Sequence, residues 1–87
     1  MNKADDQKLE IHYPCQWQYR LIGEDREAMM EAIRSSVDIA VCTITEGNVS
    51  SGGRYLSLNL ELPVNDEAER QRLYRIFSKH PAIRIVL

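Results

Sequence analysis

The hydrophobic and polar positions of the chain alternate most regularly between Gly53 and Pro63. Within this segment leucine occupies every second position, and the residues between are serine, asparagine and glutamate. A period of two is typical of a β-strand that buries one face and leaves the other open to water or a partner. The expected inward set is Leu56, Leu58, Leu60 and Leu62. The glycine and the proline mark the strand ends, because both residues interrupt a β-ladder.

Three further segments are also predicted as strands. Cys15–Ile22 alternates in the same way and stops at Gly23, with Cys15, Trp17, Tyr19 and Leu21 as its apolar set. Ile39–Thr45 is uncharged and rich in β-branched residues, and we favour Ala40, Cys42 and Ile44 over Val41, Thr43 and Thr45 as its inward face. The glycine-rich residues 46–53 are predicted as a hairpin loop. The last strand is Ile83–Leu87, with Ile83, Ile85 and Leu87 inward and Arg84 and Val86 outward.

Two helices are predicted from apolar residues at helical spacing and from capping residues. The first covers Asp25–Ser35, and its buried stripe contains both adjacent methionines and Ile33. The second begins at an acidic capping box formed by Asp66 and Glu69 and ends near residues 78–80, because Pro81 cannot continue it. We expect one core, built from Trp17, Leu21, Ile33, Leu56, Leu58, Leu60, Leu73, Phe77 and Ile85.

The element order β-α-β-β-α-β predicts an α+β fold of the ferredoxin-like type, a four-stranded antiparallel sheet with both helices on one face. The first strand and the leucine strand should be central, and Ile39–Thr45 and Ile83–Leu87 should be the edges. With 87 residues, the chain is expected to form a single domain over residues 13–87 after a flexible, highly charged tail over residues 1–12.

The net charge and the reactive side chains of the chain disfavour several classes of partner and activity. The net charge of −2 disfavours nucleic acid and anionic membranes as partners, and no apolar run suggests a membrane span or a secretory signal, so we expect a cytoplasmic protein. Cys15 and Cys42 are isolated and would lie on non-adjacent strands, so neither a metal site, a redox motif nor a disulfide is predicted. His12 and His80 have no partners at catalytic spacing, so we expect no catalytic residue, no cofactor and no enzymatic activity.

The open sheet face is the first candidate binding surface, because it carries short polar groups, a tyrosine and two arginines where a solvated face usually carries many charges. Its possible partner-binding residues are Gln18, Arg20, Tyr55, Ser57, Asn59 and Arg84. An RNA-binding sheet would need more aromatic residues on this face.

We further predict that Gly23 adopts a backbone conformation unfavourable to other residues, so that the chain can turn sharply into the first helix.

Three segments carry a family resemblance: YPCQWQYRLIG at Tyr13–Gly23, SSGGRYLSL at Ser50–Leu58 and LYRIFSKHPAIRIVL at Leu73–Leu87. Together they resemble the YbeD-like family of small bacterial proteins of unknown function, which is similar in fold to ACT-type regulatory domains. ACT domains bind small molecules such as amino acids near the turn after the first strand, often at a dimer interface. The resemblance therefore implies a possible ligand turn at Gly23, Glu24 and Asp25, and it implies no catalytic residues.

Two functions have the most support from the sequence, and an RNA-binding module is kept as a weaker third. The first is a non-catalytic regulatory or protein-interaction domain that docks another protein, or a second copy of itself, through the open face. The alternative is a sensor that binds an amino-acid-like effector at the Gly23 turn. Residue chemistry alone does not separate them.

Overall fold

The computed structural model describes residues 11–49 and 52–87, so most of the expected N-terminal tail lies outside the described residues. In chain order the elements are β1 (Cys15–Gly23), α1 (Arg26–Ser36), the 3-10 helix η2 (Ile39–Val41), β2 (Thr43–Val49), β3 (Leu56–Val64), α2 (Glu67–Lys79) and β4 (Ile85–Val86).

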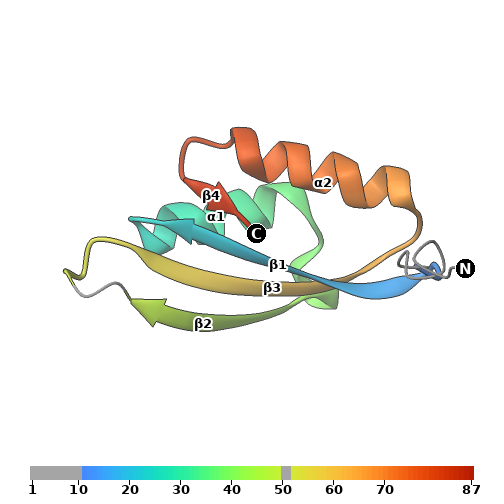
Figure 1. Ribbon diagram of the computed structural model, residues 1–87, viewed down its shortest axis with the longest axis horizontal. Coiled ribbons are helices and arrows are strands. Elements are labelled where there is room, and N and C mark those ends of the chain that lie inside the picture. The colour runs from blue at the N-terminus through green and yellow to red at the C-terminus, as the bar shows by residue number, and fades with distance from the viewer. Residues whose placement is uncertain (1–10, 50–51) are drawn as a thin grey trace, which may run out of the picture.

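The strands form one antiparallel sheet in the order β2-β3-β1-β4, and both helices pack on the same face of it (Figure 1). The central strands β1 and β3 pair along their whole length, from Cys15 opposite Val64 to Gly23 opposite Leu56. This is the predicted ferredoxin-like arrangement, including the assignment of central and edge strands.

The core lies between the sheet and the two helices. Leu58, Leu60 and Leu62 are buried, which confirms the inward face of the leucine strand at these positions. Leu56 was also expected in the core but is only half-buried, at the start of the strand. Trp17 was expected within the core but is only partly buried and packs against it. The buried set comprises Tyr19, Leu21, Met29, Ala32, Ile33, Leu58, Leu60, Leu62, Val64, Leu73, Phe77, Ile83 and Val86.

Both helices start at the predicted acidic caps. The Asp25 carboxylate accepts hydrogen bonds from the backbone N–H groups of Glu27 and Ala28, at 3.0 and 3.3 Å. At α2, Asp66 accepts from the Glu69 N–H at 2.8 Å. The Glu69 carboxylate reaches back to the N–H of Asn65 at 2.7 Å, one residue before the cap. These bonds satisfy backbone donors that a helix start otherwise leaves unpaired.

The second strand begins later than the sequence indicated. Residues 39–41 form η2 because the Asp38 carboxylate accepts from the Ala40 N–H at 3.0 Å, which stabilises a local turn in place of a ladder. Ala40 is therefore exposed, whereas Cys42 and Ile44 are half-buried, as favoured. The strand continues to Val49, so part of the expected hairpin loop pairs with β3; Ser50 and Ser51 lie outside the described residues.

The terminal strand faces the opposite way from the prediction. Val86 pairs with Leu21 and is buried, whereas Ile85 pairs with Ile22 and is 49% exposed. Leu87 is exposed too, so the assignment of Ile85 to the core and of Leu87 to the inward face was wrong. Ile83 is buried as expected, but it lies before β4, in a turn where its N–H donates to the carbonyl of His80. That turn breaks the alternation between Ile83 and the strand.

The predicted special conformation of Gly23 was also wrong. Among the described glycines only Gly53 has a positive φ, of 73°. Gly23 is needed for space instead, because a Cβ atom there would lie 2.5 Å from the carbonyl oxygen of Ala82 and 2.7 Å from the sulfur of Met29. The end of β1, the start of α1 and the segment before β4 therefore meet at a point where no side chain fits.

We expect Gly23→Ala to lower the free energy of unfolding by about 1–3 kcal/mol, because backbone on one side of the new methyl group must shift. Gly52→Ala is the matched control, since a Cβ at Gly52 meets nothing within 4 Å. Urea unfolding of both variants and the wild type measures the difference. Equal midpoints for the two variants would contradict the packing role of Gly23.

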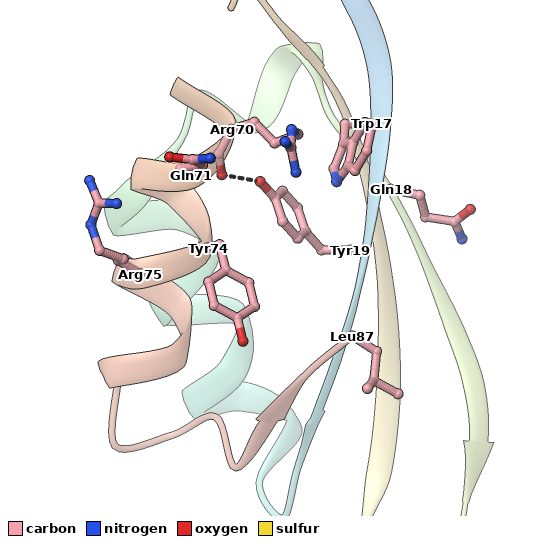
Figure 2. A pocket seen from close by; sticks show the side chains of 8 residues that line it. All are labelled: Trp17, Gln18, Tyr19, Arg70, Gln71, Tyr74, Arg75 and Leu87. Carbon is pink, nitrogen blue, oxygen red and sulfur yellow. Dashed lines mark hydrogen bonds between the residues drawn. The ribbon is translucent and has the colours of Figure 1, made fainter. Parts of the chain in front are cut away.

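Tyr19 joins the sheet to α2 (Figure 2). Its ring meets Phe77 edge-on with centroids 5.8 Å apart, and its hydroxyl donates to the backbone carbonyl of Arg70 at 2.5 Å. Burial of the hydroxyl raises the pKa of Tyr19 to about 12, and the nearby Arg70 guanidinium offsets part of this rise. The neutral phenol is therefore the form that the fold stabilises.

This raised pKa predicts a pH dependence of stability. The stabilising contribution is complete below the unfolded-state pKa of 10.0 and is lost as the pH rises toward about 12, because the unfolded chain ionises first. Tyr19→Phe should cost about 1 kcal/mol at neutral pH through the lost hydrogen bond. Its deficit relative to the wild type should shrink as the pH passes 10.0.

Denaturant titrations at a series of pH values measure this difference. Tyr74→Phe is the control, because the Tyr74 side chain is 49% exposed and its hydroxyl makes no hydrogen bond within the described part of the chain. A Tyr19→Phe deficit that stays constant with pH would show that ionisation of Tyr19 does not limit alkaline stability.

Candidate functional site

The open face of the sheet is hollowed at the end where β2 and β3 approach their connection. Both helices lie on the other face, so neither covers this hollow (Figure 1). We call it the face hollow; its volume is about 780 Å³. It is lined by Arg20, Ile22, Gly47, Asn48, Val49, Tyr55, Leu56, Ser57, Asn59, Arg84 and Ile85.

An irregularity in β2 shapes one wall of the face hollow. The pairing of β2 with β3 shifts register between Glu46 and Val49, and such a bulge bends a strand. Gly47 lies in this segment, and a Cβ atom there would be only 2.2 Å from the Ser57 hydroxyl oxygen. The same hydroxyl donates to the carbonyl of Asn48 at 3.4 Å. A larger residue at position 47 would therefore force the Ser57 hydroxyl out of its present position.

Two arginines give the face hollow its charge. Arg20 donates its Nε–H to the Asn59 side-chain oxygen across the strand pair, at 3.3 Å. Arg84 donates to the Glu24 carboxylate at 2.9 Å, and Arg54 lies 3.6 Å from the same oxygen. None of the described residues that line the hollow is acidic, so its walls carry positive charge beside uncharged polar groups.

Apolar side chains complete the lining. Val49 is 62% exposed and Ile85 is 49% exposed, and Ile22 lies opposite Ile85 in the pairing of β1 with β4. None of these three residues was predicted to belong to a site. Val49 had been assigned to a loop and Ile85 to the core; Ile22 was detectable, because it neighbours the inward Leu21 and must point outward.

The predicted partner-binding residues are brought together with one exception. Arg20, Tyr55, Ser57, Asn59 and Arg84 all line the face hollow. The exception is Gln18, which lies on β1 opposite Glu61 of β3 and borders a different hollow.

The predicted ligand turn uses its polar groups within the fold. Asp25 caps α1, and the Glu24 carboxylate pairs with Arg84 and Arg54. Gly23 does not have a positive φ, so the predicted special backbone conformation no longer supports a ligand site at this turn. Ligand binding at Gly23, Glu24 and Asp25 remains a prediction that rests on the family resemblance alone.

A second hollow of about 510 Å³ lies between β1 and α2, and we call it the edge hollow. Figure 2 shows Trp17 and Tyr19 from β1 facing Arg70 and Tyr74 from α2, with Leu87 below them. The Arg70 guanidinium lies 4.5 Å from the centroid of the Trp17 ring. The lining residues are Trp17, Gln18, Tyr19, Arg70, Gln71, Tyr74, Arg75 and Leu87.

The His80 side chain and the two cysteine side chains, which lie outside the two hollows, are engaged in the fold or partly buried. His80 uses Nδ1 to accept from the Ala82 N–H at 3.1 Å. Cys15 and Cys42 are free and half-buried, and burial raises the pKa of the Cys42 thiol, which disfavours the nucleophilic thiolate. Within residues 11–49 and 52–87, no group of three or more His, Cys, Asp or Glu side chains could hold a metal ion. None of the described helices is long and apolar enough to cross a bilayer.

Comparisons with known proteins agree with the family indicated by the sequence motifs. A UPF0250 protein of Janthinobacterium sp. is 28% identical over the full length of both chains. Another, from Chromobacterium violaceum, is 25% identical and aligns with 94% of this chain and 98% of its own. A solution structure of the protein HP0495 from Helicobacter pylori superposes with a TM-score of 0.79 at 23% identity, covering 100% of this chain and 96% of that one, and it shows the same fold.

These relatives are described as UPF0250 proteins, without an activity in their names. The model of the family described as "Protein of unknown function (DUF493)" matches residues 8–87. The chain therefore belongs to the DUF493 family of proteins of unknown function.

Proposed function

We propose that this protein is a non-catalytic docking domain whose open sheet face binds a partner protein. The observation that carries the proposal is the composition of the face hollow, in which exposed apolar side chains lie beside two arginines and several uncharged polar groups. An apolar centre with polar groups that can form hydrogen bonds is the usual anatomy of a protein interface.

The charge of the face hollow indicates the chemistry of its partner. Arg20 and Arg84 both line it, and the described lining residues include no carboxylate. The Glu24 carboxylate that engages Arg84 lies outside the hollow and is shared with Arg54. A partner surface that places an apolar side chain between carboxylates would therefore match the hollow in both shape and charge.

The size of the apolar surface suggests a modest affinity. Full burial of a valine or isoleucine side chain contributes about 1.5–3 kcal/mol, so the partly exposed Val49 and Ile85 would add roughly 2–3 kcal/mol together. Association costs several kcal/mol in lost translational and rotational freedom, so polar contacts must supply the remainder. A reversible complex suits this balance better than a permanent one.

The small-molecule alternative has weaker support, because the carboxylates of the Gly23 turn already have partners within the fold. A regulatory role of the ACT type and a cytoplasmic location remain predictions from the sequence. Neither is needed for the docking proposal.

The docking proposal predicts position-specific cross-linking. A photoreactive amino acid placed at Val49 should form a discrete adduct with a partner in cells, because Val49 borders the face hollow. The same amino acid at Val41 is the matched control, since Val41 is a similarly exposed valine, at 53% against 62%, but lies in η2. Mass spectrometry of the adduct identifies the partner.

The identified partner is then purified and its affinity measured for the wild type and for Ile85→Asp. The substitution puts a charge on the apolar wall, and we expect it to weaken binding about tenfold or more, corresponding to 1.4 kcal/mol or more. Adducts that are identical at Val49 and Val41, or an unchanged affinity with Ile85→Asp, would contradict docking through this face.

A further inference from the structure

We propose that the free edge of β1 binds an extended, acidic segment of another protein as an added β-strand. This site is separate from the face hollow. It consists of the backbone at Gln16 and Gln18 and of the edge hollow beside it. Three independent features support it: backbone groups that the described strands leave open, a hollow for a side chain, and positive charge.

Over about half of the length of β1, the described strands pair with it on one side only, the side of β3. Strand β4 has two residues and pairs with Leu21 and Ile22. Beyond it, Arg20 and Leu87 exchange two backbone hydrogen bonds, at 3.0 and 2.8 Å. Alternate residues of a strand point their N–H and C=O groups to the same edge, so those of Gln18 and Gln16 point there as well.

No strand in the described part of the chain covers the edge at Gln18 and Gln16, because β3 occupies the other edge of β1. Open edges of this kind accept an additional strand, since the main-chain hydrogen bonds are already aligned for it. An added strand in line with β4, along the same edge of the sheet, would run antiparallel to β1 and pair with these two residues.

The edge hollow would receive side chains of the added strand. Residues of a strand alternate between the two faces of a sheet, so every second side chain would point to the helix side. There it would meet the Trp17 ring and the 49% exposed Tyr74 (Figure 2). A volume of about 510 Å³ accommodates a large aliphatic or aromatic side chain.

The charge of the edge hollow selects an acidic segment. Its described lining contains Arg70 and Arg75 and no aspartate or glutamate side chain. Arg70 is held in place by stacking on Trp17 and by donating its Nε–H to the Tyr13 hydroxyl at 2.9 Å, while its terminal nitrogen lies 3.9 Å from the nearest Glu67 oxygen. A preorganised guanidinium binds a carboxylate with less loss of side-chain entropy.

The test uses a capped seven-residue peptide in which leucine, glutamate and leucine alternate with threonine, titrated into the ¹⁵N-labelled full chain. We expect the amide resonances of Gln16 and Gln18 to shift and their hydrogen exchange to slow. A peptide with lysine in place of glutamate should bind about tenfold more weakly, because it meets Arg70 and Arg75 with like charge.

Two variants of α2 separate a specific site from general attraction. Arg75→Glu should weaken binding of the glutamate peptide about tenfold. Lys79→Glu makes the same change of charge on the same helix outside the edge hollow and should leave the affinity unchanged. Ile85→Asp, which disrupts the face hollow, should also leave it unchanged, so a failure here is distinguishable from failure of the docking proposal.

Equal effects of Arg75→Glu and Lys79→Glu, or shifts confined to β2, would overturn the proposal. Protection of Gln16 and Gln18 without peptide, together with a doubled mass in sedimentation, would identify a second copy of this chain as the occupant and would overturn it as well.

Discussion

The pairing of β1 with β3 is the interaction on which the rest of the structure depends. Its register places Leu21 beside Leu58 and Tyr19 beside Leu60, so one face of the two strands forms the floor of the core. The same register places Arg20 beside Asn59 on the opposite face. Because side chains alternate strictly along each strand, the alignment that builds the core also assembles the polar centre of the open face.

The elements that could be predicted from the sequence are those whose signals are local. Leucine alternation located β3, and the acidic residues Asp25 and Asp66 located both helix starts. The errors came from competing interactions. Asp38 stabilises a 3-10 turn where β-branched residues favoured a strand, and a turn after His80 shifts the alternation that had placed Ile85 inward. The close approach at Gly23 depends on Ala82, far along the chain, and has no local signal.

The candidate surfaces follow the same division. The polar residues of the face hollow were predictable, because they alternate with core leucines along β3 and with apolar and aromatic residues along β1. Its apolar wall was not, since Val49 and Ile85 lie on edge strands whose limits depend on tertiary pairing. The edge hollow arises because the two paired strands differ in length, with nine residues in β1 and two in β4. The hydrophobic alternation along Ile83–Leu87 had predicted a longer β4.

Trp17 is the only tryptophan of the chain, and it lies in the edge hollow beneath the Arg70 guanidinium. Indole fluorescence responds to the exposure of the ring to water and to charges near it. The intrinsic emission of this protein is therefore dominated by one known location, at the border between β1 and α2. The unlabelled chain carries its own optical reporter there, and separation of α2 from the sheet or occupation of that border would register in it directly.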